Sequence, residues 1–323
     1  MSHHSTDAPT GRTRRRRRGG EQPMVPRAEF GSYYGKPILN PPVWAAADVG
    51  GYLFFGGLAG ASAVIAAGAR LTQRPRLARI SSAGAAGAGL LSFAALIHDL
   101  GRPDRFLNML RVLKPTSPMS VGTWVLGPFV PLAAVAAASS LTGRFRGLGR
   151  LAGTSAAVLG PAVSAYTGAL IANTAVPAWH DAHRELPFVF TASSAAAAGG
   201  LGLFAPTTES APARVLAVAG AGCEVLAFEQ MRHRMGLTAE PYGTGPAGRL
   251  IKTGTALSVA GALGAVLGRR SRLASAASGA ALLAASLCTR LGIFRGGVAS
   301  AEDPKYTVIP QRERLRAAAE EES

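Results

Sequence analysis

The sequence predicts an all-α integral membrane protein, a helical bundle of about eight transmembrane helices. Hydrophobic residues make up 48% of the 323 residues, and charged residues make up only 16%. The charged residues are also clustered: residues 43–69 contain one, Asp48, and residues 80–97 and 119–143 contain none. A soluble helix of that length carries a polar face, whereas a membrane span needs about 20 mainly apolar residues to cross roughly 30 Å of hydrocarbon. We therefore expect membrane spans and not a soluble helical bundle, because such long uncharged runs are hard to solvate.

Eight segments are long and apolar enough to be spans. They cover residues 44–69, 80–98, 120–141, 151–175, 186–205, 213–231, 250–268 and 273–294. Most of them are rich in Ala and Gly, and small residues allow helices to approach closely in lipid. We expect such close packing at Gly56 and Gly60 in the first span and at Gly264 and Gly268 in the seventh. The sixth span is the least typical because it contains two glutamates.

The chain divides into a basic N-terminal tail (1–43), an eight-helix transmembrane domain (44–298) and a C-terminal tail (299–323). Residues 14–18 are an unbroken run of arginines among Gly, Ser, Thr and Pro, a composition that predicts disorder. No apolar region follows the run directly, so it is not typical of a signal peptide. The net charge of +16 would suggest a nucleic-acid partner in a soluble protein. Here most arginines lie in loops and tails, so we expect contact with membrane lipid and no nucleic-acid partner.

Eight spans would put both termini on one side of the membrane, here called the N-side. The N-side carries most of the 34 Lys and Arg residues, which favours a cytoplasmic N-side in the plasma membrane. The loops on the opposite side are short and dense in arginine, and short loops weigh most in the positive-inside rule. The two counts disagree, so the preference rests on total charge alone. The opposite arginines are Arg70, Arg74, Arg76, Arg79, Arg144, Arg146, Arg150, Arg269, Arg270 and Arg272.

The cysteines and histidines argue against a redox metal centre within this chain. The two cysteines, Cys223 and Cys288, lie inside predicted spans, and no C-x-x-C motif is present. A membrane b-type haem takes two histidines from facing helices, but only His98 lies at a helix end near the membrane. We therefore expect no haem and no iron–sulfur cluster in this chain, which disfavours a cytochrome b-type anchor.

The loop between the second and third spans is the most informative segment. Its start packs five ionisable groups into eight residues, after which apolar and basic residues alternate in a pattern that predicts a short amphipathic helix at the interface. The ionisable groups are His98, Asp99, Arg102, Asp104 and Arg105.

Several motifs resemble those of the NrfD/polysulfide reductase membrane-anchor family. They are G-Y-L-F-F-G-G-L-A-G (51–60), H-D-L-G-R-P with R-F-L-N-M-L-R-V (98–112), S-P-M-S-x-G-x-W (117–124), Y-T-G (166–168) and V-P-A-W with L-P-F-V-F (176–190). The C-terminal D-P-K-Y-T-V-I-P-Q-R-E-R (303–314) looks like an actinobacterial branch of the family. The resemblance covers about residues 30–315.

The resemblance implies a haem-free membrane anchor subunit of a respiratory oxidoreductase complex. Such a subunit binds a quinone, for example menaquinone, or its quinol as substrate. It exchanges electrons with a ferredoxin-like subunit that carries four iron–sulfur clusters. That subunit contacts a molybdopterin catalytic subunit, here of the formate dehydrogenase or sulfur-compound reductase type.

The expected quinone site lies at the N-side mouth of the first four spans. Asp48 is one turn into the first span, and Tyr52 follows at i+4 on the same face. His98 and Asp99 end the second span on the same side, where a carboxylate or imidazole can accept a quinol proton. The resemblance adds Tyr166 as a hydrogen-bond donor to a ring oxygen of the quinone. The expected quinone-binding set is Tyr166, His98, Asp48, Asp99 and Arg102, the last as a partner of Asp99.

Two further sets of residues have expected roles. Glu224 and Glu229, in the sixth span, are candidates for a proton path, because ionisable residues inside a span are commonly functional. Arg105, Arg111 and Lys114 combine charge with an apolar stripe and are expected to dock the iron–sulfur partner. The alternative function is a transporter or a proton-translocating protein without a redox role, but the sequence shows no clear internal repeat.

Overall fold

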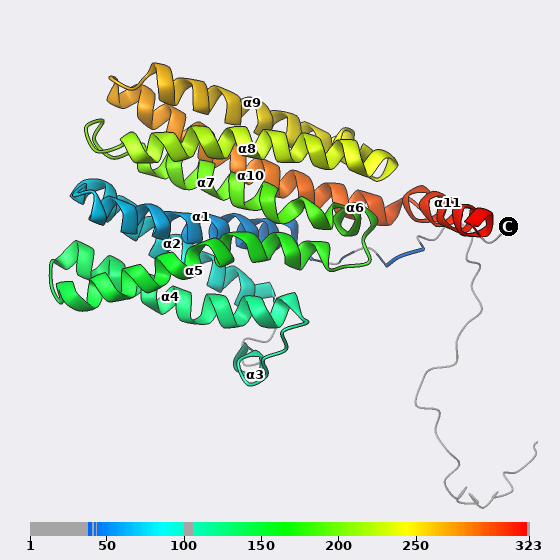
Figure 1. Ribbon diagram of the computed structural model, residues 1–323, viewed down its shortest axis with the longest axis horizontal. Helices are drawn as coiled ribbons and strands as arrows, with labels where there is room; N and C mark the ends of the chain where they lie inside the picture. The colour runs from blue at the N-terminus through cyan, green and yellow to red at the C-terminus, as the bar shows by residue number, and fades with distance from the viewer. Residues whose placement is uncertain (1–37, 41, 43, 100–105, 322–323) are drawn as a thin grey trace, which may run out of the picture. The chain divides into compact units, whose positions relative to one another are not determined.

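The computed structural model describes residues 38–40, 42, 44–99 and 106–321, and this part of the chain contains helices and no strands. Most of the predicted N-terminal tail, together with Arg102, Asp104 and Arg105, lies outside the described residues. The helices (Figure 1) are α1 (Ala46–Leu71), α2 (Pro75–Asp99), α3 (Phe106–Met109), α4 (Pro118–Thr142), α5 (Arg146–Ala172), α6 (Pro177–Asp181), η2 (Ala182–Arg184), α7 (Leu186–Gly202), α8 (Ala211–Met235), η3 (Gly236–Tyr242), α9 (Gly245–Leu267), α10 (Arg272–Glu302) and α11 (Lys305–Glu321).

Seven of the described helices are long and apolar enough to cross a membrane, and α7 is a shorter apolar helix of 17 residues. Each of the eight predicted spans corresponds to one of these helices, so the prediction of an all-α membrane bundle is confirmed. The helix α7 is near the lower length limit for a span. The short elements α6 and η2 precede it, so this part of the chain is not one continuous helix.

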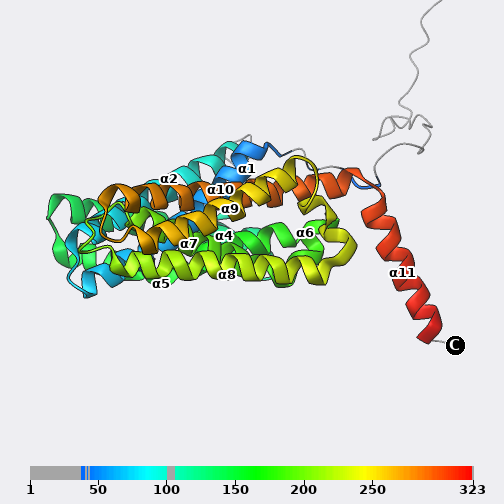
Figure 2. The same ribbon diagram turned by 90° about the horizontal axis from the view of Figure 1, so that it is seen from above.

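The long helices form two groups of four, α1, α2, α4 and α5 in one and α7–α10 in the other (Figures 1 and 2). Helix α1 contacts α2 and α5 in its own group and α7 and α10 in the other. Its apolar side chains, among them Leu53, Leu58 and Ile65, belong to the main core. Helix α1 therefore joins the two groups.

Glycines allow the closest helix contacts, as the Ala/Gly-rich composition predicts. A Cβ added at Gly60 would collide with the carbonyl oxygen of Gly160 in α5, and the reverse is also true. In the second group, a Cβ at Gly264 would lie 2.5 Å from the Ser278 hydroxyl of α10. Backbones that approach this closely gain van der Waals contact, which drives helix association in lipid.

The start of α1 and the end of α10 lie at the same end of the bundle. There the ring of Trp44 stacks on the ring of Trp179, with centroids 6.2 Å apart. The indole of Trp179 is fully buried and donates a 2.9 Å hydrogen bond to the carbonyl oxygen of Ile293 in α10. The segment 299–323, assigned to a C-terminal tail from the sequence, contains the end of α10 and the whole of α11, which Figure 2 shows.

The predicted amphipathic helix between the second and third spans is short, since α3 has only four residues. The chain after α3 is instead held by α4. The Ser120 hydroxyl and the Trp124 indole both donate hydrogen bonds to the carbonyl oxygen of Val112, at 3.0 and 3.3 Å. These bonds give the S-P-M-S-x-G-x-W motif a structural role at the start of α4, where Ser117 is the N-cap.

Candidate functional site

A pocket of about 380 Å³ opens between the helices of the first group, at the end where α1 begins. Most of its wall is apolar, and polar groups lie at a few places on it. Its lining residues are Trp44, Asp48, Val49, Tyr52, Leu53, Ala95, Leu96, Asp99, Ser117, Pro118, Met119, Leu170, Ile171, Asn173 and Thr174. An apolar cavity with a few convergent polar groups is the usual form of a small-molecule site.

Two tyrosines link this pocket to the interior of the bundle. Tyr52 lines the pocket, and its hydroxyl is hydrogen-bonded to the hydroxyl of Tyr166 in α5. The two rings meet edge to face with centroids 6.3 Å apart, and both side chains are buried. Tyr166, which the sequence analysis placed at the quinone, thus lies behind Tyr52 and reaches the pocket through it.

The ring of Tyr166 fits only because its neighbour in α4 is a glycine. A Cβ added at Gly122 would lie 2.5 Å from a ring carbon of Tyr166. Two separate motifs of the sequence, S-P-M-S-x-G-x-W and Y-T-G, therefore meet at one contact in space.

Three ionisable residues lie at the mouth of the pocket. Asp48 and Asp99 line it, and Oδ2 of Asp48 lies 3.1 Å from Nδ1 of His98. The His98 side chain is 77% exposed, whereas Asp48 is 30% exposed. Asp99 also interacts electrostatically with Asp48 and with His98. The structure thus brings together three of the expected site residues, with His98 at the rim and outside the pocket lining.

The expected docking residues lie beside this mouth. Arg111 and Lys114 are exposed, in the segment between α3 and α4. Ser117 at the end of this segment and Pro118 and Met119 at the start of α4 form part of the pocket wall. A protein bound to this segment would therefore lie next to the pocket.

The second group of helices buries an acidic and a basic side chain in its interior. Glu224 of α8 is 4% exposed, and Arg290 of α10 is fully buried. Arg290 donates through Nη2 to the carbonyl oxygen of Phe190 at 2.7 Å and to the Ser194 hydroxyl at 2.8 Å. The space beside Glu224 amounts to only about 10 Å³.

Hydroxyl groups surround Glu224. The Ser258 hydroxyl donates to its Oε2 at 3.4 Å, and Thr289 lines the same small space. Oε1 of Glu224 and two guanidinium nitrogens of Arg290 have no hydrogen-bond partner among the described atoms. Buried polar atoms without partners are costly.

Glu229, the other proton-path candidate, lies in a different environment. Its side chain is 47% exposed and forms an ion pair of 3.1 Å with Arg232, three residues further along α8. The structure therefore does not bring Glu224 and Glu229 into one network.

A strong ion pair outside the spans fixes the entry of α7 against the end of α8. Arg234 donates two hydrogen bonds of 2.6 Å to the two carboxylate oxygens of Glu185. These bonds hold the pKa of Glu185 below its usual range. Arg234 also donates to the carbonyl oxygen of Asp181, so one side chain ties three segments together.

Sequence reasoning assigned no role to Tyr52 or Arg290. The i+4 spacing from Asp48 to Tyr52 was visible, and it correctly placed both on one face of α1. Arg290 gave no comparable signal, because it is a single charge in an otherwise apolar span. Its partners in α7 are about a hundred residues away in the chain.

The described residues contain no group of three or more His, Cys, Asp or Glu side chains arranged to hold a metal ion. Cys223 is exposed on α8, and Cys288 is half-buried in α10.

Comparison with known proteins identifies the family. The family model described as polysulphide reductase, NrfD, matches residues 38–211, which is more than half of the chain and includes the whole pocket lining. A search of curated proteins finds no match. Members of this family are membrane anchors of quinone-interacting oxidoreductase complexes, and they normally pair with iron–sulfur and molybdenum subunits. The chain belongs to the NrfD polysulphide reductase family of integral membrane proteins.

Proposed function

We propose that this protein is the quinone-reactive membrane subunit of a respiratory oxidoreductase complex, and that the pocket between α1, α2, α4 and α5 holds the quinone head group. One observation carries the proposal: an apolar pocket has two carboxylates at its mouth and Tyr52 on its wall, and the buried Tyr166 is hydrogen-bonded to Tyr52 from behind. A quinone ring needs an apolar slot, and its two oxygens need donors and acceptors of protons.

The chemistry requires both protons and electrons. Oxidation of one quinol releases two protons and two electrons, and reduction of one quinone consumes the same numbers. The pocket residues of this chain supply the proton exchange, whereas the electrons pass to or from an iron–sulfur cluster of a partner subunit. This division explains why a chain with only two cysteines can serve a redox complex.

The tyrosines and the mouth residues have separate roles in this proposal. Tyr52 donates a hydrogen bond to one quinone oxygen, and Tyr166 orients the Tyr52 hydroxyl from behind. Asp48 and Asp99 exchange protons with the head group, and His98, paired with Asp48, passes them to the surface. Arg102 is proposed as the partner of Asp99.

The iron–sulfur subunit is proposed to dock on the segment that includes Arg105, Arg111 and Lys114. Arg111 and Lys114 are exposed, and the segment continues directly into the pocket wall at Ser117. Docking here keeps the electron-transfer distance short. The partner is proposed to be ferredoxin-like with four clusters and to contact a molybdopterin subunit of the formate dehydrogenase or sulfur-compound reductase type.

Glu224 is proposed as part of a proton path through the second group of helices, with Glu229 as its exposed entrance. The unpartnered atoms of Glu224 and Arg290 support this role, since intramembrane ionisable residues commonly mark proton relays. The same observation favours the alternative function, a proton-translocating protein without a redox role. The membrane is proposed to be the plasma membrane, with a cytoplasmic N-side.

The test of the quinone site is a pair of conservative variants in the assembled complex. In Tyr52→Phe and Tyr166→Phe, quinone-linked turnover should fall about tenfold, the kinetic equivalent of one lost hydrogen bond of about 1.4 kcal/mol. Activity of the catalytic subunit with an artificial dye should stay normal, because the dye bypasses the pocket. Tyr306→Phe, on α11 away from the pocket, is the matched control.

Unchanged quinone kinetics in both Tyr166→Phe and His98→Ala would show that the site is wrong. It would also leave the alternative function as the better explanation of the buried Glu224.

The docking proposal has its own test. Arg111→Glu with Lys114→Glu should release the iron–sulfur partner in a pull-down, because two charges are reversed on one exposed segment. Arg312→Glu with Arg316→Glu, on the exposed face of α11, is the control with the same change of charge. A complex that survives the first pair intact would place the docking site elsewhere.

A further inference from the structure

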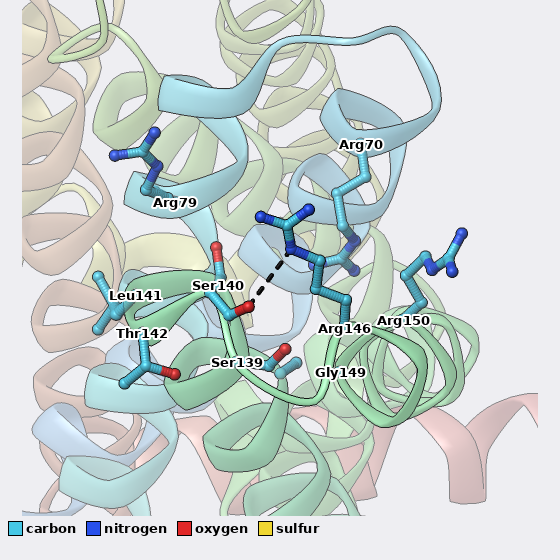
Figure 3. Close-up of a pocket in the computed structure, with 11 residues that line it drawn as sticks. Arg70, Arg79, Ser139, Ser140, Leu141, Thr142, Arg146, Gly149 and Arg150 are labelled. Carbon is cyan, nitrogen blue, oxygen red and sulfur yellow. Dashed lines mark hydrogen bonds between the residues drawn. The ribbon is translucent and has the colours of Figure 1, made fainter.

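A second pocket lies at the opposite end of the first group of helices from the proposed quinone pocket. Its volume is about 640 Å³, and four arginines contribute to its wall. Figure 3 shows Arg70 of α1, Arg79 of α2, and Arg146 and Arg150 of α5 around this hollow. An adjoining pocket of about 370 Å³ shares these four and adds Arg74. We refer to the two together as the arginine pocket.

The positive charge of the arginine pocket is not neutralised within the described chain. No carboxylate lines either cavity, and none of its arginines forms an ion pair with a described residue. The nearest acidic side chain, Glu209, is already used. Its Oε2 accepts hydrogen bonds of 2.8 and 3.1 Å from the backbone N–H groups of Arg76 and Leu77 at the start of α2.

Packing around the pocket positions two of the guanidinium groups. Arg70 donates a 3.2 Å hydrogen bond to the Ser82 hydroxyl, and a Cβ added at Gly153 would collide with its guanidinium. Arg146 donates through Nε to the carbonyl oxygen of Gly143 at 3.3 Å, which leaves its terminal nitrogens free for a ligand. Hydroxyl groups of α4 complete the wall, at Ser139, Ser140 and Thr142.

The surface next to the arginine pocket is apolar and exposed. Four large side chains at the α4–α5 turn have exposed fractions between 57% and 79%: Leu141, Phe145, Leu148 and Leu151. In an integral membrane protein, this level of the bundle is the boundary between headgroups and acyl chains. A molecule bound in the arginine pocket therefore has anion-binding groups and an exposed apolar surface side by side.

We propose that the arginine pocket binds the phosphate of an anionic phospholipid, with the acyl chains along the exposed apolar residues of the α4–α5 turn. The guanidinium fork matches phosphate oxygens in bidentate geometry, and clustered arginines without carboxylates favour a ligand with net negative charge. Basic pockets between transmembrane helices are suited to such headgroups. The proposal is independent of the quinone site, which lies at the other end of these helices.

The experiment is native mass spectrometry of the full-length protein released from detergent in the presence of defined lipids. The probes are phosphatidylglycerol, phosphatidylcholine and inorganic phosphate, each added at the same concentration. The test variant is Arg146→Gln with Arg150→Gln, since both side chains are exposed. The matched control is Arg269→Gln with Arg270→Gln, two exposed arginines at the same end of the bundle in the α9–α10 turn.

The expected result is retention of phosphatidylglycerol over phosphatidylcholine by the unaltered protein and by the control. The test variant should retain it about thirtyfold less, the effect expected for two basic residues at a headgroup. Equal loss in both variants would overturn the proposal, because the attraction would then be one of general surface charge. Displacement of the lipid by equimolar inorganic phosphate would overturn the lipid source and indicate a soluble phosphate-bearing ligand.

Discussion

The two groups of helices bury polar residues in opposite ways. In the first group, Asp48 and Asp99 lie at the mouth of a pocket of about 380 Å³, and the buried hydroxyls of Tyr52 and Tyr166 satisfy each other. In the second group, Arg290 is fully buried, and Glu224 is buried beside a space of only about 10 Å³. The first arrangement suits a molecule that enters and leaves, whereas the second has room only for protons or single waters.

The family match sharpens this comparison. It covers residues 38–211, and so all of the first group and α7, but not the glutamate of α8 or the arginine of α10. The pocket is thus part of the region that defines the family. The Glu224–Arg290 pair lies in the part of the chain that the match does not cover.

The largest effect on stability is expected at Arg290. In Arg290→Met, the carbonyl oxygen of Phe190 and the Ser194 hydroxyl each lose the hydrogen bond that Arg290 donates, and Glu224 remains buried without that cation. Breaking one partner of such a buried set costs about 3–5 kcal/mol. The measurement is the free energy of unfolding in detergent by SDS titration.

The control for this change lies on the same helix. Arg295 is exposed, so Arg295→Met should change the unfolding free energy by less than about 0.5 kcal/mol. Adding Glu224→Gln to Arg290→Met should recover part of the loss, because the uncompensated acid is removed. If Arg290→Met and Arg295→Met have equal effects, the buried pair does not stabilise the second group.

A smaller effect is expected in the first group, at the glycine that accommodates Tyr166. In Gly122→Ala, the new methyl group meets the Tyr166 ring and should displace it, at a cost of about 1–3 kcal/mol. Quinone-linked turnover should fall together with stability, because Tyr166 supports Tyr52 at the pocket. Gly127→Ala on the same helix has ordinary contact distance, with its nearest neighbour at 3.6 Å, and should leave both unchanged. A Gly122→Ala protein with normal turnover would show that the position of Tyr166 does not matter for the pocket.

The smallest effect is expected at the Glu185–Arg234 pair, and it depends on pH. The folded state lowers the pKa of Glu185 because Arg234 donates two hydrogen bonds to it. The resulting stability is present above the pKa of an unfolded glutamate, about 4.3, and is lost as the pH falls through the lower folded pKa. The free energy of unfolding of the unaltered protein should therefore be about 1–2 kcal/mol higher than that of Glu185→Gln at neutral pH. This difference in stability should shrink below about pH 4.

Thermal unfolding of both proteins from pH 7 to pH 3 measures this difference. A gap that stays constant over the whole range would mean that the charge of Glu185 contributes nothing to folding.

The sequence was most informative where lipid imposes the pattern. Spans must be long and uncharged, so their number and approximate bounds can be predicted from composition. The small residue Gly60 likewise indicated a close helix contact, which α1 makes with α5. The sequence also predicted that Asp48 and Tyr52 share one face of α1, because this depends only on their helical spacing.

Contacts between helices that are far apart in the chain could not be predicted from the sequence. Tyr52 and Tyr166 are separated by 114 positions, and their pairing depends on how α1 packs on α5. Arg290 is buried only because α7 presents the carbonyl of Phe190 and the hydroxyl of Ser194 to it. The amphipathic helix predicted after Pro103 is limited to the four residues of α3, since α4 binds the following segment at Val112.

The most direct test of the difference between the two groups is photolabelling of the purified complex with an azido-quinone, followed by peptide mass spectrometry. We expect the label on the four pocket segments, residues 44–53, 95–99, 117–119 and 170–174. This labelling should be lost when excess unlabelled quinone competes for the pocket. The label should remain in Arg290→Met, provided that variant still folds, because the second group does not hold the ring. Competable label on α8, α9 or α10, with none on the pocket segments, would contradict the account.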